Sequence, residues 1–169
     1  MKPLLYVDGY NVIGAWAEAE KNAWPLDECR DRLIHVLEDY AGYTGQEVWL
    51  IFDGYKAERP MRSVEQRAGL TVVYTRHGET ADHYIERMCQ LLPRYREARV
   101  ATSDGVEQTL ILGRGATRLS ARELWRELGR ERSSGRGRHQ TPSAQQRTAL
   151  SSALSAEQYA VLDKLRRQK

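Results

Sequence analysis

The chain has 169 residues, which is enough for one domain with a sheet covered by helices on both faces. Its composition, 41% hydrophobic and 29% charged, is ordinary for a globular protein, and no apolar run approaches the roughly 20 residues of a membrane helix. The net charge of +3 is unevenly placed: residues 1–119 carry 15 Lys and Arg against 18 Asp and Glu, whereas residues 120–169 carry 11 against 5. An acidic body with a basic end indicates a polyanionic partner, with acids reserved for a metal site.

The first residues and the cysteines predict the cellular compartment of the protein. The chain enters a strand within its first eight residues, which leaves no room for a signal or transit peptide. Cys29 and Cys89 each lie in a helical pattern without the spacing of a zinc site, so we expect two buried thiols. Both features favour a cytoplasmic protein.

Two buried strands are predicted in the first third of the chain, and each ends on an Asp-Gly pair. Residues 4–7 form a short apolar run that stops at Asp8, and residues 48–52 form a second run that stops at Asp53. Between them, over residues 26–40, apolar side chains recur at helical spacing. The predicted order is therefore strand, helix, strand, with an acid after each strand.

The alternation continues in the middle of the chain. Residues 70–74 are rich in β-branched and aromatic side chains and predict a third strand, after which Thr80 can cap a helix. Residues 99–102 predict a fourth strand, which closes on Ser103 and Asp104. A short segment at 116–119 is followed by a helix that begins with a Ser-x-x-Glu capping box.

The C-terminal part differs in composition from the rest. Over residues 130–155 the chain is dominated by Arg, Ser, Gly, Gln and Thr, which predicts a flexible basic linker. Residues 156–169 return to a helical pattern and predict a short basic helix. We therefore expect a folded domain over 1–129 and a basic tail after it.

The alternating pattern predicts an α/β domain with a mostly parallel, doubly wound sheet. Right-handed crossovers bring the carboxyl ends of such strands to one edge, where ligands bind. Asp8, Asp53 and Asp104 end strands at that edge, and Asp82 lies in the first turn of the helix after the third strand. Taken singly, each acid is better explained by turn or helix-start chemistry. Taken together, four acids at one edge favour a site for Mg²⁺ or Mn²⁺.

Several other polar and aromatic residues belong to the same region, and each has two interpretations. Asn11, one helical turn past Asp8, is either a ligand near the metal or a plain helix cap. Ser103 binds either a phosphate or the backbone, and Tyr10 either stacks on a base or packs in the core. Three arginines in or next to the short segment at 116–119 either hold phosphates or form a solvated helix face: Arg114, Arg118 and Arg122.

The chain resembles a known family, the YacP-like branch of the NYN-domain nucleases, in the PIN-like superfamily. The resemblance rests on motifs that follow one another in order over residues 3–128. They are VDGYNVI at 7–13 with Trp16, FDGY at 52–55, VYT at 73–75, ETADHYIE at 79–86, ATSD at 101–104 and GATRLSAREL at 115–124.

The resemblance implies a PIN-like three-layer α/β/α sandwich and an endoribonuclease that cuts single-stranded RNA with Mg²⁺ or Mn²⁺. It implies that Asp8, Asp82 and Asp104 hold the metal and that Asn11 and Asp53 support them. One relative in this branch resembles a ribosome-associated mRNA endonuclease, so mRNA and the translating ribosome are the expected partners.

Rival functions are distinguished by residues near the first strand. An RNA- or ribosome-binding module with little nuclease activity would be favoured by loss of the acids, and all of them are present. An aspartyl phosphohydrolase needs a second Asp two residues after the first, where this chain has Tyr10. A nucleotide-binding domain needs a glycine-rich phosphate loop after the first strand, and none follows it, so we expect no nucleotide cofactor.

Overall fold

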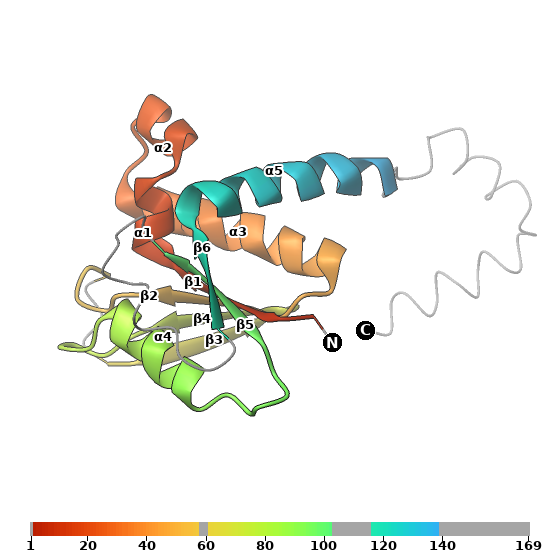
Figure 1. The fold of residues 1–169 in the computed structure, drawn as a ribbon. Helices are drawn as coiled ribbons and strands as arrows, with labels where there is room; N and C mark the ends of the chain where they lie inside the picture. Colours follow the sequence, from red (N-terminus) through yellow and green to blue (C-terminus); the bar gives the residue numbers. More distant parts are fainter. Residues whose placement is uncertain (1, 58–60, 103–115, 139–169) are drawn as a thin grey trace, which may run out of the picture. The chain divides into compact units, whose positions relative to one another are not determined.

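In the computed structural model, the described residues are 2–57, 61–102 and 116–138, and side chains are described up to residue 134 (Figure 1). The compact unit that carries the sheet ends at Ser133. The elements of the described part follow in this order: β1 (Leu4–Asp8), α1 (Gly9–Gly14), α2 (Ala17–Asn22), α3 (Leu26–Thr44), β2 (Val48–Phe52), β3 (Ser63–Arg67), β4 (Leu70–Tyr74), α4 (Ala81–Gln90), β5 (Ala98–Thr102), β6 (Ala116–Ser120) and α5 (Ala121–Arg138).

The sheet has the strand order β3-β4-β2-β1-β5-β6, and every neighbouring pair is parallel except β3 with β4. From β1 the chain adds β2 on one side and later returns to add β5 on the other side. The strand order therefore reverses between β1 and β5. This is the place where ligands bind in a doubly wound sheet.

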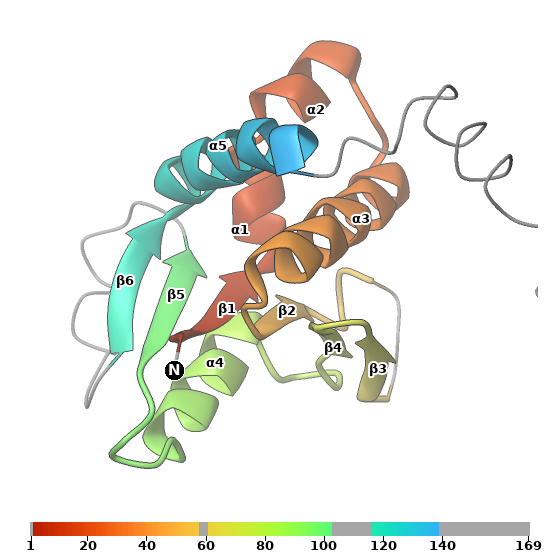
Figure 2. The ribbon, with the colours of Figure 1, turned by 90° about the vertical axis from the view of Figure 1, so that its right-hand side faces the viewer.

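Helices cover both faces of the sheet, as Figures 1 and 2 show: α1, α3 and α5 lie on one face and α4 on the other. Successive side chains of a strand point to opposite faces, so β1 sends Leu5 and Val7 into the core under α3 and α5, and Tyr6 into the core under α4. Because both faces are covered, β1 and β4 are buried along their whole length and are mostly apolar. The three-layer α/β/α sandwich expected from the sequence is confirmed.

The structure also contains elements that the sequence analysis did not predict. Strand β3 has the sequence SVEQR, with a single apolar residue, because it is an edge strand whose side chains are largely exposed. Helices α1 and α2 have six residues each, which is too short to show a helical period. Helix α3, in contrast, shows the expected period and ends at Gly45, whose φ of 66° lies in the left-handed region.

Helix α5 is longer than expected and continues to Arg138, into the segment predicted to be a linker over residues 130–155. The capping box that begins the helix is present: Ser120 and Glu123 exchange hydrogen bonds of 2.8 and 3.1 Å. Leu124 and Leu128 anchor the helix in the core, and the Arg and Glu residues that follow are good helix formers. The boundary expected at residue 130 therefore lies inside a helix. The remainder of the predicted linker and the helix predicted over 156–169 lie outside the described residues.

The two cysteines are buried and free, as predicted. Cys29 packs in the core under α3, and Cys89 packs in the core under α4. In the described part of the chain, no helix combines the length and the apolar composition needed to cross a membrane.

Candidate active site at the carboxyl edge of the sheet

The strand register places the ends of β1, β2 and β4 at one edge of the sheet. Asp8 pairs with Ile51 of β2, and Phe52 at the end of β2 pairs with Tyr74 at the end of β4. β5 ends beside β1, because Val7 pairs with Ala101. The residues that follow these four strands therefore leave the sheet at one edge.

Asp8 is the last residue of β1 and is only 5% exposed. It stands at the N-terminus of α1, yet its side chain does not cap that helix. Its Oδ2 atom instead accepts a hydrogen bond of 2.8 Å from Nδ2 of Asn11. The turn and cap interpretations of Asp8 are therefore not supported by the geometry, and Asn11 is oriented toward the same carboxylate.

The turn from β1 into α1 has no room for a side chain at residue 9. A Cβ atom on Gly9 would lie 2.3 Å from the Phe52 ring, far closer than real contacts allow. The glycine therefore lets α1 begin directly beside the end of β2. This close approach keeps Asp8 and Asn11 beside the end of β2.

Asp82 lies close to Asp8, although it comes from α4 on the other face of the sheet. Burial raises the pKa of Asp8 to about 8, together with a hydrogen bond and charge repulsion between the two carboxyl groups. Asn11 and the ammonium group of Lys56 act in the opposite direction without cancelling these effects. The predicted convergence of Asp8 and Asp82 is thus present, and Lys56 is a neighbour that the sequence did not single out.

A buried threonine positions the segment that carries Asp82. The Thr75 hydroxyl is fully buried, donates to the carbonyl oxygen of Glu79 at 2.7 Å and accepts from the Gly54 N–H at 3.0 Å. Thr80 then caps α4 by accepting from the His83 N–H at 3.2 Å. The first turn of α4, which carries Asp82, is therefore held in place. Sequence analysis missed Thr75, because a threonine after a β-strand carries no distinctive pattern.

Asp53 follows β2 at the same edge and has a local contact. Its Oδ1 atom accepts a hydrogen bond of 3.0 Å from the Tyr55 N–H, which is the geometry of an Asx turn. This is the turn chemistry that the sequence analysis weighed as the alternative. Asp53 therefore shapes the loop that carries Gly54 and Lys56 beside Asp8.

Tyr10 is held on several sides. Its hydroxyl accepts a hydrogen bond of 3.2 Å from Arg30, and its ring lies 5.2 Å from that of Phe52, centroid to centroid. Nζ of Lys56 lies 5.5 Å from the ring centroid. Tyr10 is half-buried, so it combines a packing role with a surface that faces the site.

An open groove of about 520 Å³ is lined by Asn11, the residue that donates a hydrogen bond to Asp8. Tyr10, Asn11 and Glu20 line it on one side, and Ala121 and Arg122 at the start of α5 line it on the other. Arg118 lies on β6, where it pairs with Val100 of β5. Ser103, Asp104 and Arg114 lie outside the described residues.

Comparisons with known proteins identify the family. The model of the YacP-like NYN domain matches residues 5–167. This chain belongs to the YacP-like NYN-domain family. The match runs beyond the motifs quoted above and includes the segment 130–155, so the family resemblance is not confined to residues 3–128. The family is related to the PIN-like nucleases.

Individual relatives of this YacP-like chain are found in Bacillus subtilis. This chain is 41% identical over 127 residues to the uncharacterized protein YacP of B. subtilis strain 168, and the match covers 74% of each chain. The crystal structure of Rae1 (YacP) from B. subtilis matches with a TM-score of 0.69 at 37% identity, over 99% of this chain and 95% of that one. A tryptophan-to-leucine mutant of Rae1 matches with a TM-score of 0.67 at 34% identity, over 97% and 99% of the two chains.

The acids of the YacP-like chain suit a divalent cation. Asp8 and Asp82 bring oxygen donors together in a place where burial and repulsion disfavour two negative charges, which a cation would relieve. Among the residues that the structure describes, no three acids, histidines or cysteines form a complete metal-binding group. The third predicted ligand, Asp104, follows the end of β5 by two residues and belongs to the undescribed segment.

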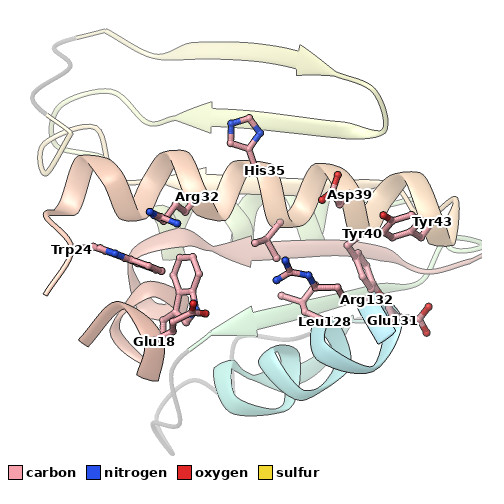
Figure 3. A pocket seen from close by; sticks show the side chains of 12 residues that line it. Glu18, Trp24, Arg32, His35, Asp39, Tyr40, Tyr43, Leu128, Glu131 and Arg132 are labelled. Carbon is pink, nitrogen blue, oxygen red and sulfur yellow. The ribbon is translucent and has the colours of Figure 1, made fainter. Parts of the chain in front are cut away.

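A second hollow, of about 330 Å³, lies on the side of the YacP-like domain that carries α3 and α5 (Figure 3). Its walls come from α3, from α5 and from the segment around Trp16 and Trp24, whose rings meet edge to face at 5.4 Å. The Trp16 ring also stacks on Trp125 at 4.4 Å. None of the predicted site residues that the structure describes lines this hollow, and neither Asp8 nor Asp82 does.

Proposed function

We propose that the protein is a metal-dependent endoribonuclease that hydrolyses phosphodiester bonds of single-stranded RNA. The observation that carries the proposal is the proximity of the buried Asp8 and the exposed Asp82 at the edge where the strand order reverses. Membership of a family related to PIN-like nucleases supports the same reaction class.

The proposed roles follow from the position of each residue. Asp8, Asp82 and Asp104 would hold Mg²⁺ or Mn²⁺, which when bound supplies an activated water and neutralises charge on the phosphate. Asn11 fixes the orientation of the Asp8 carboxylate through its 2.8 Å hydrogen bond. Asp82, which is exposed at the start of α4, would either complete the metal site or act as the base that takes a proton from the attacking water.

The residues around the acids are proposed to bind the substrate. Tyr10 and Arg122 line the groove next to Asn11, which suits a nucleotide beside the scissile bond. Arg118, Arg114 and Ser103 complete the proposed set of RNA contacts, and Asp53 supports the site through its turn. The basic end of the sequence, residues 120–169, is consistent with a large polyanionic partner. We propose mRNA on the translating ribosome as that partner.

The test compares the full chain with Asp8→Asn and Asp82→Asn on labelled single-stranded RNA, with Mg²⁺, Mn²⁺ or a chelator. Asp31→Asn, an exposed acid on α3, is the matched control. We expect cleavage by the wild type and the control, and loss of cleavage in both site variants and with chelator. Cleavage that survives both chelation and Asp8→Asn would overturn the proposal. Adding ribosomes to the same reactions tests whether the activity depends on them.

A further inference from the structure

Three arginine side chains converge on one buried carboxylate. Nη2 of Arg62 donates to both carboxylate oxygens of Glu79 at 2.7 Å, and Nη1 of Arg87 donates to Oε2 at 3.1 Å. Nε of Arg76 lies 3.8 Å from the same oxygen. Three positive charges therefore surround one negative charge. The Glu79 side chain is 7% exposed, whereas those of Arg62, Arg76 and Arg87 are 38%, 67% and 44% exposed.

The arginines lie at the same edge of the sheet as the acid pair. Ser63, the first residue of β3, pairs with Tyr74, the last residue of β4. Arg62 precedes β3 and Arg76 follows β4, so both leave the sheet at the edge that carries Asp8. In the order β3-β4-β2-β1, β3 is three strand spacings from β1, which is a distance of about 14 Å.

The geometry of the cluster suits the binding of phosphate. A guanidinium group has five N–H donors, and the contacts with Glu79 use only some of them. Glu79 and the Tyr84 ring, whose centroid lies 5.3 Å from Arg62 and 5.4 Å from Arg87, fix the two side chains in place. Arginines that are already ordered lose less entropy when they bind a ligand. The single negative charge of the Glu79 carboxylate is balanced by one arginine. The cluster therefore keeps a net positive charge that can attract an anion.

We infer that Arg62, Arg76 and Arg87 form a phosphate-binding patch that holds the RNA backbone on the β3–α4 side of the acid pair. The inference rests on the proposed function, because it names the path of the same substrate. Arg122, at the start of α5 beside β6, lies on the other side of β1 in the strand order. The RNA strand thus crosses the acid pair along the sheet edge, with arginines on both sides.

The test measures binding of a labelled single-stranded oligoribonucleotide in the presence of chelator, as a function of salt. The variants are Arg76→Gln and the double variant Arg76→Gln/Arg87→Gln. The matched control is Arg67→Gln, because Arg67, the last residue of β3, pairs with Leu70 at the opposite edge of the sheet and forms ion pairs with Glu38 and Glu65. Thermal unfolding of each variant is recorded in parallel.

Each lost phosphate contact should weaken binding about fivefold at about 0.1 M salt and reduce the salt slope by about 0.7. We expect this for Arg76→Gln at an unchanged unfolding temperature, about twice the slope change for the double variant, and no change for Arg67→Gln. If the double variant unfolds, the single variant carries the test. Binding by Arg76→Gln that equals the control would overturn the inference.

A cleavage assay of the wild type with Mn²⁺ separates this inference from the proposed function. If the wild type cuts RNA while Arg76→Gln binds RNA like the control, the patch is wrong and the nuclease assignment stands. If Arg76→Gln loses affinity while the wild type cuts no RNA, the patch stands and the nuclease assignment fails.

Discussion

The carboxyl groups of Asp8 and Asp82 lie close together, although one residue ends β1 and the other lies in the first turn of α4. Burial and the neighbouring Asp82 raise the pKa of Asp8 to about 8. A divalent cation at this position would relieve the repulsion between the two carboxylates.

The buried Thr75 hydroxyl links the two loops that flank this acid pair. Replacing it in Thr75→Val leaves the Gly54 N–H and the Glu79 carbonyl without that partner, at a cost of about 1–3 kcal/mol in the free energy of unfolding. RNA cleavage should fall as well, because the start of α4 loses its anchor. Urea unfolding and a cleavage assay measure the two effects. Thr71→Val is the control, since its hydroxyl contacts only the side chain of Gln66 on the exposed strand β3; an equal loss in both variants would contradict the account.

Gly9 is required by the close approach of the β1–α1 turn to Phe52. In Gly9→Ala the new methyl group would meet the Phe52 ring, so the turn or the ring must shift. We expect a loss of about 1–3 kcal/mol of stability, together with reduced RNA cleavage. In Gly42→Ala, on α3, nothing lies near the added methyl group, and stability should rise by about 0.5–1 kcal/mol. Chemical denaturation of both variants gives the comparison, and a neutral Gly9→Ala would show that the contact is unimportant.

The Glu79 carboxylate should stabilise the fold in a pH-dependent way. Burial favours its neutral form, but the hydrogen bonds and charges of Arg62 and Arg87 outweigh this and lower its pKa below the usual 4.5. A lowered pKa means that the stabilisation is present above the unfolded-state value and is lost as the pH falls through the folded-state value. Glu79→Gln replaces hydrogen bonds to a charged group and should cost about 1.5–3 kcal/mol at neutral pH. The difference from wild type should shrink on acidification.

The control for Glu79 is Glu28→Gln, which removes the partner of Arg32 in an exposed ion pair on α3. Exposed pairs of this kind contribute about 0–1 kcal/mol. Thermal unfolding from neutral to acidic pH measures both variants. A Glu79→Gln difference that grows on acidification would contradict the direction assigned to its pKa.

The sequence predicted the central strands and the long helices because their patterns are produced by burial itself. β1, β2 and β4 are apolar on both faces, and α3 shows a helical period, so each carried its own signal. β3 carried none, because an edge strand that faces solvent needs few apolar residues. The end of α5 was misjudged because composition suggested a linker, whereas helix propagation from a capped and anchored start carried the helix to Arg138.

For the candidate site, the positions of the acids along the chain predicted which of them lie close together. Those positions did not predict which residues surround each acid. The rule that parallel strands end at one edge was enough to bring Asp8 and Asp82 together, and the structure agrees. It was not enough to show that Asp53 closes a local turn, or that Glu79 is buried among three arginines. The arginine cluster depends on the pairing of β3 with β4, which places Arg62 next to the end of β4 and which the sequence pattern did not reveal.

The metal site is the central claim, and titration of the full chain with Mn²⁺ in a calorimeter tests it most directly. The wild type and Asp31→Asn should bind with the same affinity. Asp8→Asn and Asp82→Asn should each weaken binding by at least about tenfold, since loss of even an outer-shell partner weakens metal binding by that amount. Wild-type affinity in Asp8→Asn would contradict the assignment of the acid pair as the metal site.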